Sequence, residues 1–499
     1  MIGETSARPA NMAGQDSRTG AAPSSAASVL SLSSILFVLA GGVALFLATQ
    51  LRNPLYLGLR PVLRSLTLGA PLIVLMLLLR PAIWANRKTM AHGSAGCAWL
   101  AIALWLATPI IAATQEGRHL WQRHTVLSLA RDVPDAALPQ PSETARQLGA
   151  HLVISYDALP EMRSLAQSGL IGGVYIGAEA LRSRNLFALR EEIAELQTVR
   201  ADAGLPPLIV TTDQEGGIVS RLSPPLMHLP PLAEVIADAP LDDIERRAFD
   251  YGALQGRELA DLGINVNLAP LADLAAPGSH RRYDLRSLIG QRAIGVDPQR
   301  VSRAVIGYTR GLESSGVEAT LKHFPGLGRV SGDTHLIPTA LAASENDLET
   351  RDWIPFREGL AETSALMMVG HATLPTIDAT RPASRSRRVV QGIVRDHWKH
   401  EGVLITDDLS MGAARQDGTC SAGIEALNAG IDLLLITYDV SQYFEVFACA
   451  LDAASDGRIT AQTLATSDAR LAMLRRTNAA IGQKRGIAGD RAAGPPAAG

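Results

Sequence analysis

From about residue 148 onward, short apolar runs alternate with longer segments of mixed polarity. The runs are rich in Val, Ile and Leu, and most of them lack an alternation of apolar and polar positions. There are eight of them: His151–Tyr156, Ile171–Ile176, Leu208–Asp213, Ile264–Pro270, Val317–His323, Ala365–His371, Val403–Asp407 and Ile431–Thr437. Strands that are buried on both faces, as in parallel sheets, have this pattern.

The segments between these runs can form amphipathic helices, as in Arg190–Thr198, Arg246–Leu262, Pro298–Ser315 and Ser386–His400. Eight strands that alternate with helices predict an α/β protein with a (β/α)8 barrel, the TIM barrel. An open, doubly wound sheet is the alternative. It is less favoured because no glycine-rich turn of the dinucleotide-binding type follows the first run.

The first quarter of the chain has a different pattern, with three long apolar runs in a stretch that contains no acidic residue between Asp16 and Glu116. The runs cover roughly residues 29–49, 66–79 and 97–113. The first is about as long as a bilayer core requires, and the others are near the lower limit. We therefore expect an α-helical membrane region of about three transmembrane helices over residues 29–115, with the lipid bilayer as its partner. Buried helices of a soluble domain are the alternative.

Aromatic residues support the membrane interpretation. Four of the six tryptophans lie around the second and third runs, as interfacial anchors often do: Trp84, Trp99, Trp105 and Trp121. A cleaved signal peptide fits less well, because a polar segment, residues 1–28, precedes the first run and no basic segment adjoins it. We expect that polar segment to be disordered, and the protein to be a multi-pass protein of a bacterial inner membrane.

Basic residues next to the runs predict the orientation. With three spans, the N-terminus shares one side of the membrane with four of them: Arg18, Arg80, Arg87 and Lys88. The opposite side has five: Arg52, Arg60, Arg64, Arg118 and Arg123. This small excess predicts a cytoplasmic location for the C-terminal part, and the periplasm is the alternative.

The remaining boundaries and the composition complete the domain organisation. Residues 116–147 are expected to be a linker, 148–485 the barrel, and the Gly-, Ala- and Pro-rich residues 486–499 a disordered tail. With 47% hydrophobic and 19% charged residues, the chain is not of a disordered, collagen-like or coiled-coil class. A net charge of −3 argues against nucleic-acid binding. The three cysteines, at positions 97, 420 and 449, are too far apart in sequence for a disulfide framework or a cysteine zinc site.

Ionisable residues end four of the eight runs. They are Asp213 in the third, Lys322 and His323 in the fifth, His371 in the sixth, and Asp407 with Asp408 in the seventh. In a TIM barrel the C-terminal ends of the strands meet at the face that carries catalytic groups. Taken singly, an Asp in such a place often caps a helix and a His is often a core residue. Together, the four strands predict an active site at this face.

Two loops add to the predicted site. After Asp213, two glycines allow a tight turn and Arg221 offers a forked donor, a combination suited to sugar hydroxyls. The glycine-rich segment after the fifth run carries Asp333 and His335, and we expect it to move over a pocket. A carboxylate bonded to one ring nitrogen fixes the tautomer of a histidine and leaves the other nitrogen for proton exchange.

The seventh run ends in two adjacent acids, which point in different directions at a strand end. A poorly solvated carboxylate near Lys322 or Arg221 remains ionised and nucleophilic. We assign this role to Asp407, and we expect Asp408 to face outward and cap the following helix.

These motifs resemble those of glycoside hydrolase family 3, specifically its single-barrel β-N-acetylhexosaminidases. The similar stretches occur in the family's order and cover about residues 148–480: Asp213–Gly217 with Arg221, Gly263–Asp273, Lys322–Pro338, Met368–Asp378 and Thr406–Met411. Each stretch alone is of limited specificity, but the set is highly specific.

The resemblance implies roles for individual residues. It makes Asp407 the nucleophile and His335, oriented by Asp333, the general acid/base of a retaining double displacement. Six residues match positions that hold or line the sugar site: Asp213, Arg221, Arg292, Lys322, His323 and His371. For His371 a structural role is equally open. No metal or cofactor is implied. The expected substrate is a saccharide with terminal, non-reducing β-N-acetylglucosamine, released from muropeptides in cell-wall recycling; chitobiose and a glycolipid remain alternatives.

Three departures from the family pattern concern specificity. Leu327 replaces a frequent histidine, Ile218 replaces the usual arginine after the double glycine, and the membrane region is absent from the usual soluble members. Three other functions remain open: a metal-dependent hydrolase, a non-catalytic glycan-binding barrel, and a β-glucosidase or xylosidase. Members of that last kind usually take the acid/base from a second domain, whereas here only a short tail is expected after the barrel.

Overall fold

The computed structural model describes residues 32–78, 92–130, 141–276 and 284–475. The predicted disordered segments, residues 1–28 and 486–499, lie outside the described residues. The chain divides into two compact units. The first comprises Met1–Leu51 and Gly58–Gln115, and the second comprises Arg52–Leu57 and Glu116–Gly499.

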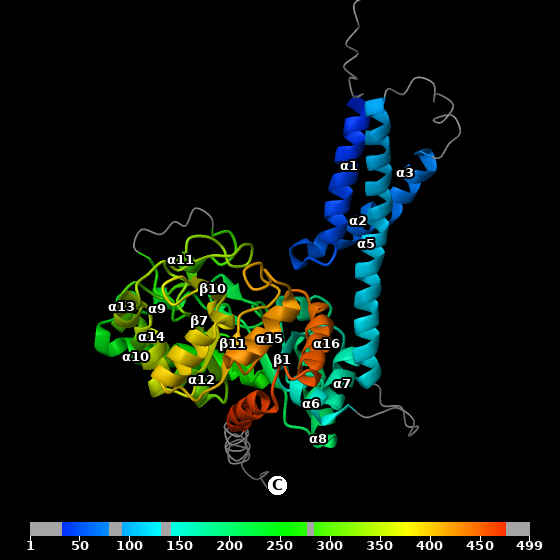
Figure 1. The fold of residues 1–499 in the computed structure, drawn as a ribbon. Coiled ribbons are helices and arrows are strands. Elements are labelled where there is room, and N and C mark those ends of the chain that lie inside the picture. Colours follow the sequence, from blue (N-terminus) through cyan, green and yellow to red (C-terminus); the bar gives the residue numbers. More distant parts are fainter. Residues whose placement is uncertain (1–31, 79–91, 131–140, 277–283, 476–499) are drawn as a thin grey trace, which may run out of the picture. The chain divides into compact units, whose positions relative to one another are not determined.

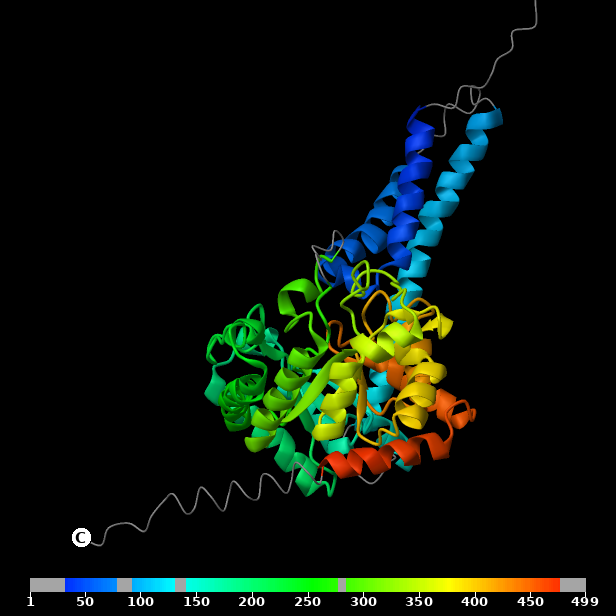
Figure 2. The ribbon, with the colours of Figure 1, turned by 90° about the vertical axis from the view of Figure 1, so that its left-hand side faces the viewer.

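Eight parallel strands form a nearly closed barrel in the second unit (Figures 1 and 2). They are β1 (Leu152–Ser155), β2 (Gly173–Tyr175), β3 (Ile209–Thr212), β6 (Val266–Asn267), β7 (Glu318–Phe324), β8 (Leu366–Val369), β11 (Leu404–Thr406) and β12 (Leu434–Ile436). Hydrogen bonds join them in the order β11-β8-β7-β6-β3-β2-β1-β12. A parallel bridge between Ile405 and Leu433 brings the two ends of this order together. Each predicted run contributes one strand, so the predicted α/β barrel is confirmed.

The strands lack polar alternation because both of their faces are buried. On β1, Val153 belongs to one apolar cluster together with Ile209 of β3 and Leu435 of β12. Its neighbours Leu152 and Ile154 belong to the second, larger cluster, which includes the helices. The barrel therefore has an inner core and an outer layer, and apolar residues fill both.

Helices cover the outside of the barrel (Figure 2). The longer ones are α7 (Leu159–Ser168), α8 (Leu186–Asp202), α10 (Leu241–Leu262), α12 (Pro298–Ser314), α14 (Ile354–Glu362), α15 (Thr419–Ala429) and α16 (Gln442–Ser455). The predicted helix Ser386–His400 is instead a π-helix, η6 (Arg388–His397). A segment at 461–475 is also helical. The shorter helices are α6 (Glu143–Gly149), η3 (Ala178–Leu181), α9 (Leu232–Val235), α11 (Ile289–Arg292), α13 (Glu345–Asp347), η4 (Leu348–Asp352) and η5 (Ala383–Arg385).

Two short hairpins follow barrel strands at their C-terminal ends. One follows β3 and consists of β4 (Gln214–Gly216) and β5 (Val219–Ser220). The other follows β8 and consists of β9 (Thr373–Leu374) and β10 (Asp378–Pro382). Both extend the face of the barrel on which the predicted site residues lie.

The N-terminal part is helical. Its elements are α1 (Leu32–Thr49), η1 (Pro54–Leu59), α2 (Arg60–Arg64), η2 (Ser65–Gly69), α3 (Ala70–Leu78) and α5 (His92–Ala130). Within the first unit, the Trp105 indole on α5 donates a hydrogen bond to the Phe37 carbonyl on α1 over 3.3 Å. Helix α5 continues past the third apolar run into the segment 116–147, which we expected to be a linker, because helix-compatible polar residues follow the apolar ones.

Two helical stretches, Tyr56–Val74 and Leu100–Ala130, are long and apolar enough to cross a membrane, and the helix Ile35–Thr49 is apolar but shorter. Large apolar side chains on these helices are exposed, for example Leu39 at 60% and Ile110 at 64%. Such exposure is not typical of the core helices of a soluble protein. A signal sequence also meets the criteria of length and composition. Two helices of this kind are a weak indication of membrane association, and the number of spans stays a prediction.

A disulfide joins two helices of the barrel. Cys420 on α15 and Cys449 on α16 are bonded, with their Cα atoms 5.7 Å apart. This bond differs from the expectation that the cysteines are too far apart in sequence for a disulfide framework. The fold brings together two cysteines that are 29 positions apart, because α15 and α16 are neighbours on the barrel surface.

Candidate active site

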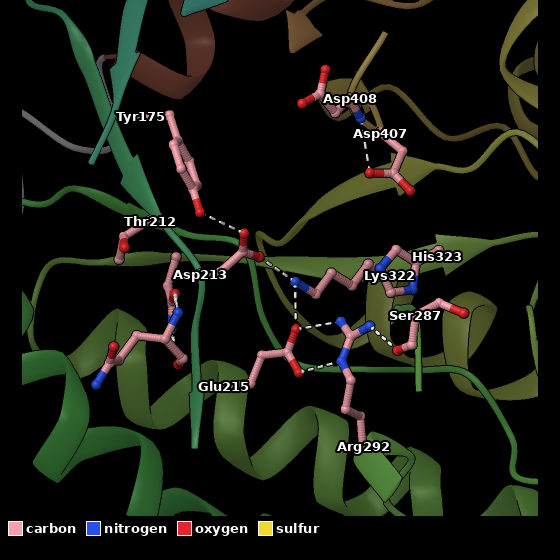
Figure 3. A network of polar contacts seen from close by, with 12 residues as sticks. Tyr175, Thr212, Asp213, Glu215, Ser287, Arg292, Lys322, His323, Asp407 and Asp408 are labelled. Atoms are coloured by element: carbon pink, nitrogen blue, oxygen red, sulfur yellow. Dashed lines mark hydrogen bonds and ion pairs between the residues drawn. The ribbon is translucent and has the colours of Figure 1, made fainter. Parts of the chain in front are cut away.

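Lys322 of β7 lies in the middle of a buried ionic network at the C-terminal face of the barrel (Figure 3). Its ammonium group contacts the carboxylate of Asp213, directly after β3, and lies 2.7 Å from Oε1 of Glu215. The hydroxyl of Tyr175, the last residue of β2, donates a hydrogen bond to Oδ2 of Asp213 over 3.0 Å. Three strands therefore contribute polar side chains at or near their C-terminal ends to one network.

The charges of this network keep Asp213 ionised. Burial alone would raise the pKa of Asp213, but the nearby cations of Lys322, Arg221 and Arg292 outweigh burial and lower the pKa to about 2. At neutral pH this carboxylate is therefore a hydrogen-bond acceptor only, as the binding of a sugar hydroxyl requires.

The hairpin after Asp213 makes the turn that the two glycines predict. Gly216 and Gly217 have φ values of +94° and +59°, a region that favours glycine. The turn brings the backbone N–H of Arg221 to the carbonyl of Asp213 at 3.1 Å, and the Arg221 side chain stays exposed. Ile218, where the family usually has arginine, is 53% exposed at the tip of the turn.

Arg292 is held by the protein itself. Its Nε donates to Oε2 of Glu215 over 3.0 Å, and its Nη1 donates to the carbonyl of Ser287 over 2.7 Å. The Arg292 and Glu215 side chains are only 8% and 7% exposed. The structure therefore places Arg292 behind Glu215, as a support for the network around Lys322. The contact of Arg292 with the sugar stays a prediction.

Asp407 follows β11 and presents its carboxylate at the same face (Figure 3). Its Oδ1 accepts a hydrogen bond from the backbone N–H of Asp408 over 2.8 Å. Burial would raise the pKa of Asp407, but three imidazoles and this hydrogen bond lower it; the imidazoles are those of His323, His371 and His335. An ionised, partly buried carboxylate at a strand tip is suited to act as a nucleophile.

Asp408 points away from the site, as predicted, but it does not cap a helix. Its Oδ2 accepts hydrogen bonds from the backbone N–H groups of Thr437 and Tyr438, over 3.1 and 2.6 Å. Its Oδ1 accepts a bond from the N–H of Ser410 over 2.7 Å. Asp408 therefore ties the end of β11 to the segment after β12.

Asp333 and His335 form the close pair that the sequence predicts. Oδ1 of Asp333 lies 2.8 Å from Nδ1 of His335 and also accepts the His335 backbone N–H. Oδ2 accepts the backbone N–H groups of Leu285 and Arg286, over 3.1 and 2.6 Å. Burial would raise the pKa of Asp333, but these hydrogen bonds and the imidazole lower it. Asp333 is therefore ionised, while the His335 side chain is 37% exposed and accessible to a substrate.

The loop that carries His335 is hydrogen-bonded to the segment that follows Asp407. The backbone N–H of Gly412 donates to the carbonyl of His335 over 2.8 Å, and that of Ala413 donates to the carbonyl of Thr334 over 3.1 Å. Residues 411–414 follow Asp407 closely in sequence. His335 and Asp407 are thus held on adjoining loops.

Both ring nitrogens of His371 contact groups of the protein. Its Nδ1 lies 2.7 Å from the hydroxyl of Ser384, and its Nε2 lies 3.1 Å from the carbonyl of Asp408. Both ring nitrogens are therefore occupied, and the side chain is 1% exposed. Burial lowers the pKa of His371, although Asp407 and Asp408 oppose this effect. His371 therefore ties the end of β8 to Ser384 and to the backbone of Asp408.

Three residues of the network were not assigned from the sequence: Tyr175, Glu215 and Asp273. Asp273 is fully buried and lies 2.7 Å from Nδ1 of His323. All three are polar residues within three positions of a strand end or within a motif that we had singled out. The position of a polar residue at a strand end was the available signal.

His371 has both nitrogens occupied, and both oxygens of Asp408 accept backbone hydrogen bonds. Among the residues that the structure describes, no group of three or more His, Cys, Asp or Glu side chains is arranged to hold a metal ion.

Relatives are found by both sequence and structure. Beta-hexosaminidases of Stenotrophomonas maltophilia and Pseudomonas aeruginosa are each 34% identical over 279 and 280 residues, which are 55% and 56% of this chain and 79% of each relative. A glycoside hydrolase family 3 beta-N-acetylglucosaminidase from Paenibacillus matches with a TM-score of 0.62 and 28% identity, over 68% of this chain and 63% of that structure.

A second solved structure, a glycosyl hydrolase of the same family from Mycobacterium smegmatis, matches with a TM-score of 0.59 and 29% identity, over 69% of this chain and 98% of that one. The sequence profile described as the Glycosyl hydrolase family 3 N terminal domain matches residues 144–474, which include the whole barrel and every residue of the site. The protein is therefore a glycoside hydrolase, and it belongs to glycoside hydrolase family 3.

Proposed function

We propose that the protein is a β-N-acetylhexosaminidase that removes terminal, non-reducing β-linked N-acetylglucosamine with retention of configuration. The observation that carries the proposal is the pairing of an ionised Asp407 at the tip of β11 with an adjoining Asp333–His335 pair. The names of the relatives, beta-hexosaminidase and beta-N-acetylglucosaminidase, support this choice of sugar.

The reaction takes two steps. In the first, an oxygen of Asp407 attacks the anomeric carbon, the glycosidic C–O bond breaks, and His335 gives its proton to the leaving oxygen. In the second, His335 takes a proton from water, the water oxygen attacks the anomeric carbon, and Asp407 leaves as a carboxylate. Asp213, which contacts Lys322, is available for the sugar hydroxyls during both steps, because the nearby cations keep it ionised.

Replacement of the nucleophile tests the proposal. We expect Asp407→Gly to lower the hydrolysis of an aryl β-N-acetylglucosaminide by at least ~10⁴-fold, since no covalent intermediate can form. Azide, a small anion that fits the vacated space, should restore turnover and yield the α-glycosyl azide. Asp352→Asn is the control, because Asp352 is a buried carboxylate that is paired with Arg329, away from Asp407 in the chain.

If Asp407→Gly kept most of its activity, the assignment of the nucleophile would be wrong. If the unaltered protein cleaved aryl β-glucosides or β-xylosides faster than the N-acetylglucosaminide, the choice of sugar would be wrong while the mechanism remained. We further propose muropeptides derived from peptidoglycan as the natural substrates, and the same comparison with chitobiose and a glycolipid tests that choice.

We also propose that the apolar N-terminal helices anchor the protein in a bilayer, as a multi-pass protein, and that the barrel lies on the oxidising, periplasmic side. The bond between Cys420 and Cys449 supports this orientation, because disulfides persist in oxidising compartments and are rare in the cytosol. It replaces the cytoplasmic location that the near-even count of basic residues predicts. Differential alkylation in intact cells tests it: both cysteines should resist alkylation until a reductant is added. Alkylation of both cysteines without a reductant would contradict the periplasmic orientation and favour a cytoplasmic barrel.

A further inference from the structure

The site contains a second Asp–His pair, formed by Asp273 and His323. Asp273 follows β6, and His323 lies on β7, 50 positions later in the chain. Oδ2 of Asp273 lies 2.7 Å from Nδ1 of His323 and 3.1 Å from its backbone nitrogen. Oδ1 accepts the backbone N–H of Leu327 over 2.6 Å. The carboxylate is therefore saturated with donors, and it is fully buried.

The protonation of Asp273 decides the tautomer of His323. Burial would raise the pKa of Asp273, but the His323 imidazole and the hydrogen bonds from the ring and from both backbone N–H groups lower it. An ionised carboxylate can only accept hydrogen bonds, so the contact at Nδ1 requires a proton on that nitrogen. In the neutral ring, Nε2 then carries a lone pair.

His323 is the neighbour with the largest effect in lowering the pKa of Asp407, which places the ring close to the nucleophile. Figure 3 shows His323 between Asp407 and the chain segment that carries Ser287. Within the described residues, no hydrogen bond to Nε2 of His323 is formed. The ring of His323 therefore lies close to the carboxylate that is proposed to attack the sugar.

We infer that Asp273 is a positioning residue: it locks His323 as the Nδ1–H tautomer and so presents Nε2 as an acceptor for one hydroxyl of the bound sugar. When a hydroxyl of the sugar donates its hydrogen to Nε2, its oxygen can still accept a hydrogen bond from the ammonium group of Lys322, the residue before His323. Asp273 would then contribute to the selection of a sugar with a hydroxyl at that position. The inference rests on the proposed function for its substrate, but the tautomer itself does not.

Nitrogen-15 NMR of the full-length protein, labelled at histidine and studied above the titration range of a neutral imidazole, tests the tautomer directly. We expect the unaltered protein to show a protonated Nδ1 and an unprotonated Nε2 at His323, with the signals assigned by comparison with His323→Gln. Asp273→Asn should reverse the pattern, because the amide can donate to Nδ1. A protonated Nε2 in the unaltered protein would overturn the inference, whether or not the protein hydrolyses any sugar.

Deoxygenated substrates test the consequence. With aryl β-N-acetylglucosaminides that lack the 3-, 4- or 6-hydroxyl, we expect Asp273→Asn to lower kcat/KM by about 10- to 100-fold for the parent sugar, the loss of one hydrogen bond to a buried partner. For one of the three deoxy sugars the variant and the unaltered protein should differ by less than about threefold. A merely structural role would lower kcat/KM equally for all four substrates, and that outcome would contradict the inference.

Two further variants keep the test decisive. Asp352→Asn, the buried carboxylate outside the site, should show no dependence on any sugar hydroxyl. If Asp273→Asn does not fold, His323→Gln should show the same selective insensitivity to one deoxy sugar. Equal losses on all four sugars with His323→Gln would again contradict the inference. If the unaltered protein hydrolyses none of the sugars, the proposed function fails, and the NMR experiment alone decides the tautomer.

Discussion

The molecule uses the same Asp–His pair in two settings. Oδ1 of Asp333 contacts both the backbone N–H and the ring Nδ1 of His335. Oδ2 of Asp273 contacts the corresponding two nitrogens of His323. The histidines differ in exposure, at 37% and 7% of their side chains. They also differ in chain separation from their partners, at two and 50 positions.

These differences separate two tasks that one side-chain pair can perform. A general acid must exchange protons with substrate and water, which requires an exposed imidazole on a loop. A hydrogen-bond acceptor for a sugar must keep one orientation, which a buried imidazole on a strand provides. The local geometry of the pair is nearly the same, so its surroundings determine the role.

Removal of the Asp333 carboxylate should lower the catalytic rate more than the changes at Asp273, Glu318 or Ser384. We expect Asp333→Asn to lower kcat/KM by ~10²- to 10⁴-fold for a substrate with a poor leaving group, since His335 then loses the group that orients it. With a dinitrophenyl leaving group, which needs no protonation, the loss should be far smaller. Equal losses for both leaving groups would show that Asp333 has no part in acid catalysis. Asp273→Asn is the contrast, because it should not depend on the leaving group.

Glu318 shows what burial does to a carboxylate without a cation. It lies at the start of β7, is fully buried, and accepts one hydrogen bond from the hydroxyl of Ser364 over 2.7 Å. Burial raises the pKa of Glu318 to about 7, with a contribution from nearby Glu313. Asp273 is equally buried, yet its pKa is lowered, because an imidazole and backbone N–H groups face it.

The sign of the Glu318 effect on stability follows from this raised pKa. As the pH rises from about 4.5 to about 7, the unfolded chain loses the proton and the folded protein keeps it, so the folded state loses up to about 3 kcal/mol of stability. Glu318→Gln removes this loss. Denaturant unfolding at pH 5 and pH 8 should therefore show that the variant is stabilised mainly at pH 8. A gain that is equal at both pH values would contradict the assigned protonation.

A third histidine near Asp407 provides the smallest effect. His371 has a hydroxyl partner, Ser384, in place of a carboxylate. We expect Ser384→Ala to lower the free energy of unfolding by about 1 kcal/mol, because one buried hydrogen bond is lost. Catalysis should change only a few-fold, as measured by kcat on an aryl substrate. A loss as large as that of Asp333→Asn would mean that the His371 tautomer also has a direct part in the reaction.

The sequence allowed the prediction of those parts of the fold that depend on local pattern. Runs such as Val403–Asp407 are apolar on both faces, so they marked the strands, and a polar residue at the end of a run marked the site. The pair Asp333–His335 was also accessible, because its members are two positions apart. Asp273–His323 was not, since nothing in the sequence shows that the ends of β6 and β7 adjoin at these residues.

Other features depended on packing. The two cysteines meet only because α15 and α16 are neighbours, and Arg292 turns to Glu215 only because the hairpin after β3 reaches it. For His371 a place in the wall of the pocket and a structural role were equally open from the sequence, and the contacts of its ring with the hydroxyl of Ser384 and the carbonyl of Asp408 appear only in the fold. Competition among partners inside the fold decides such cases, and a motif does not record it.

Asp407 and Asp408 lie at the end of β11, beside the junction where the first and last strands of the barrel meet. There, a single parallel bridge, between Ile405 and Leu433, joins the first and last members of the hydrogen-bonded order. Asp408 reaches across this junction to Thr437 and Tyr438. Asp408 thus stabilises the barrel at the place where its first and last strands meet, and Asp407 remains available for the proposed reaction beside this junction. The proposed attack of Asp407 on a sugar requires that its carboxylate keep its position, and the hydrogen bonds of the neighbouring Asp408 hold the chain in place there.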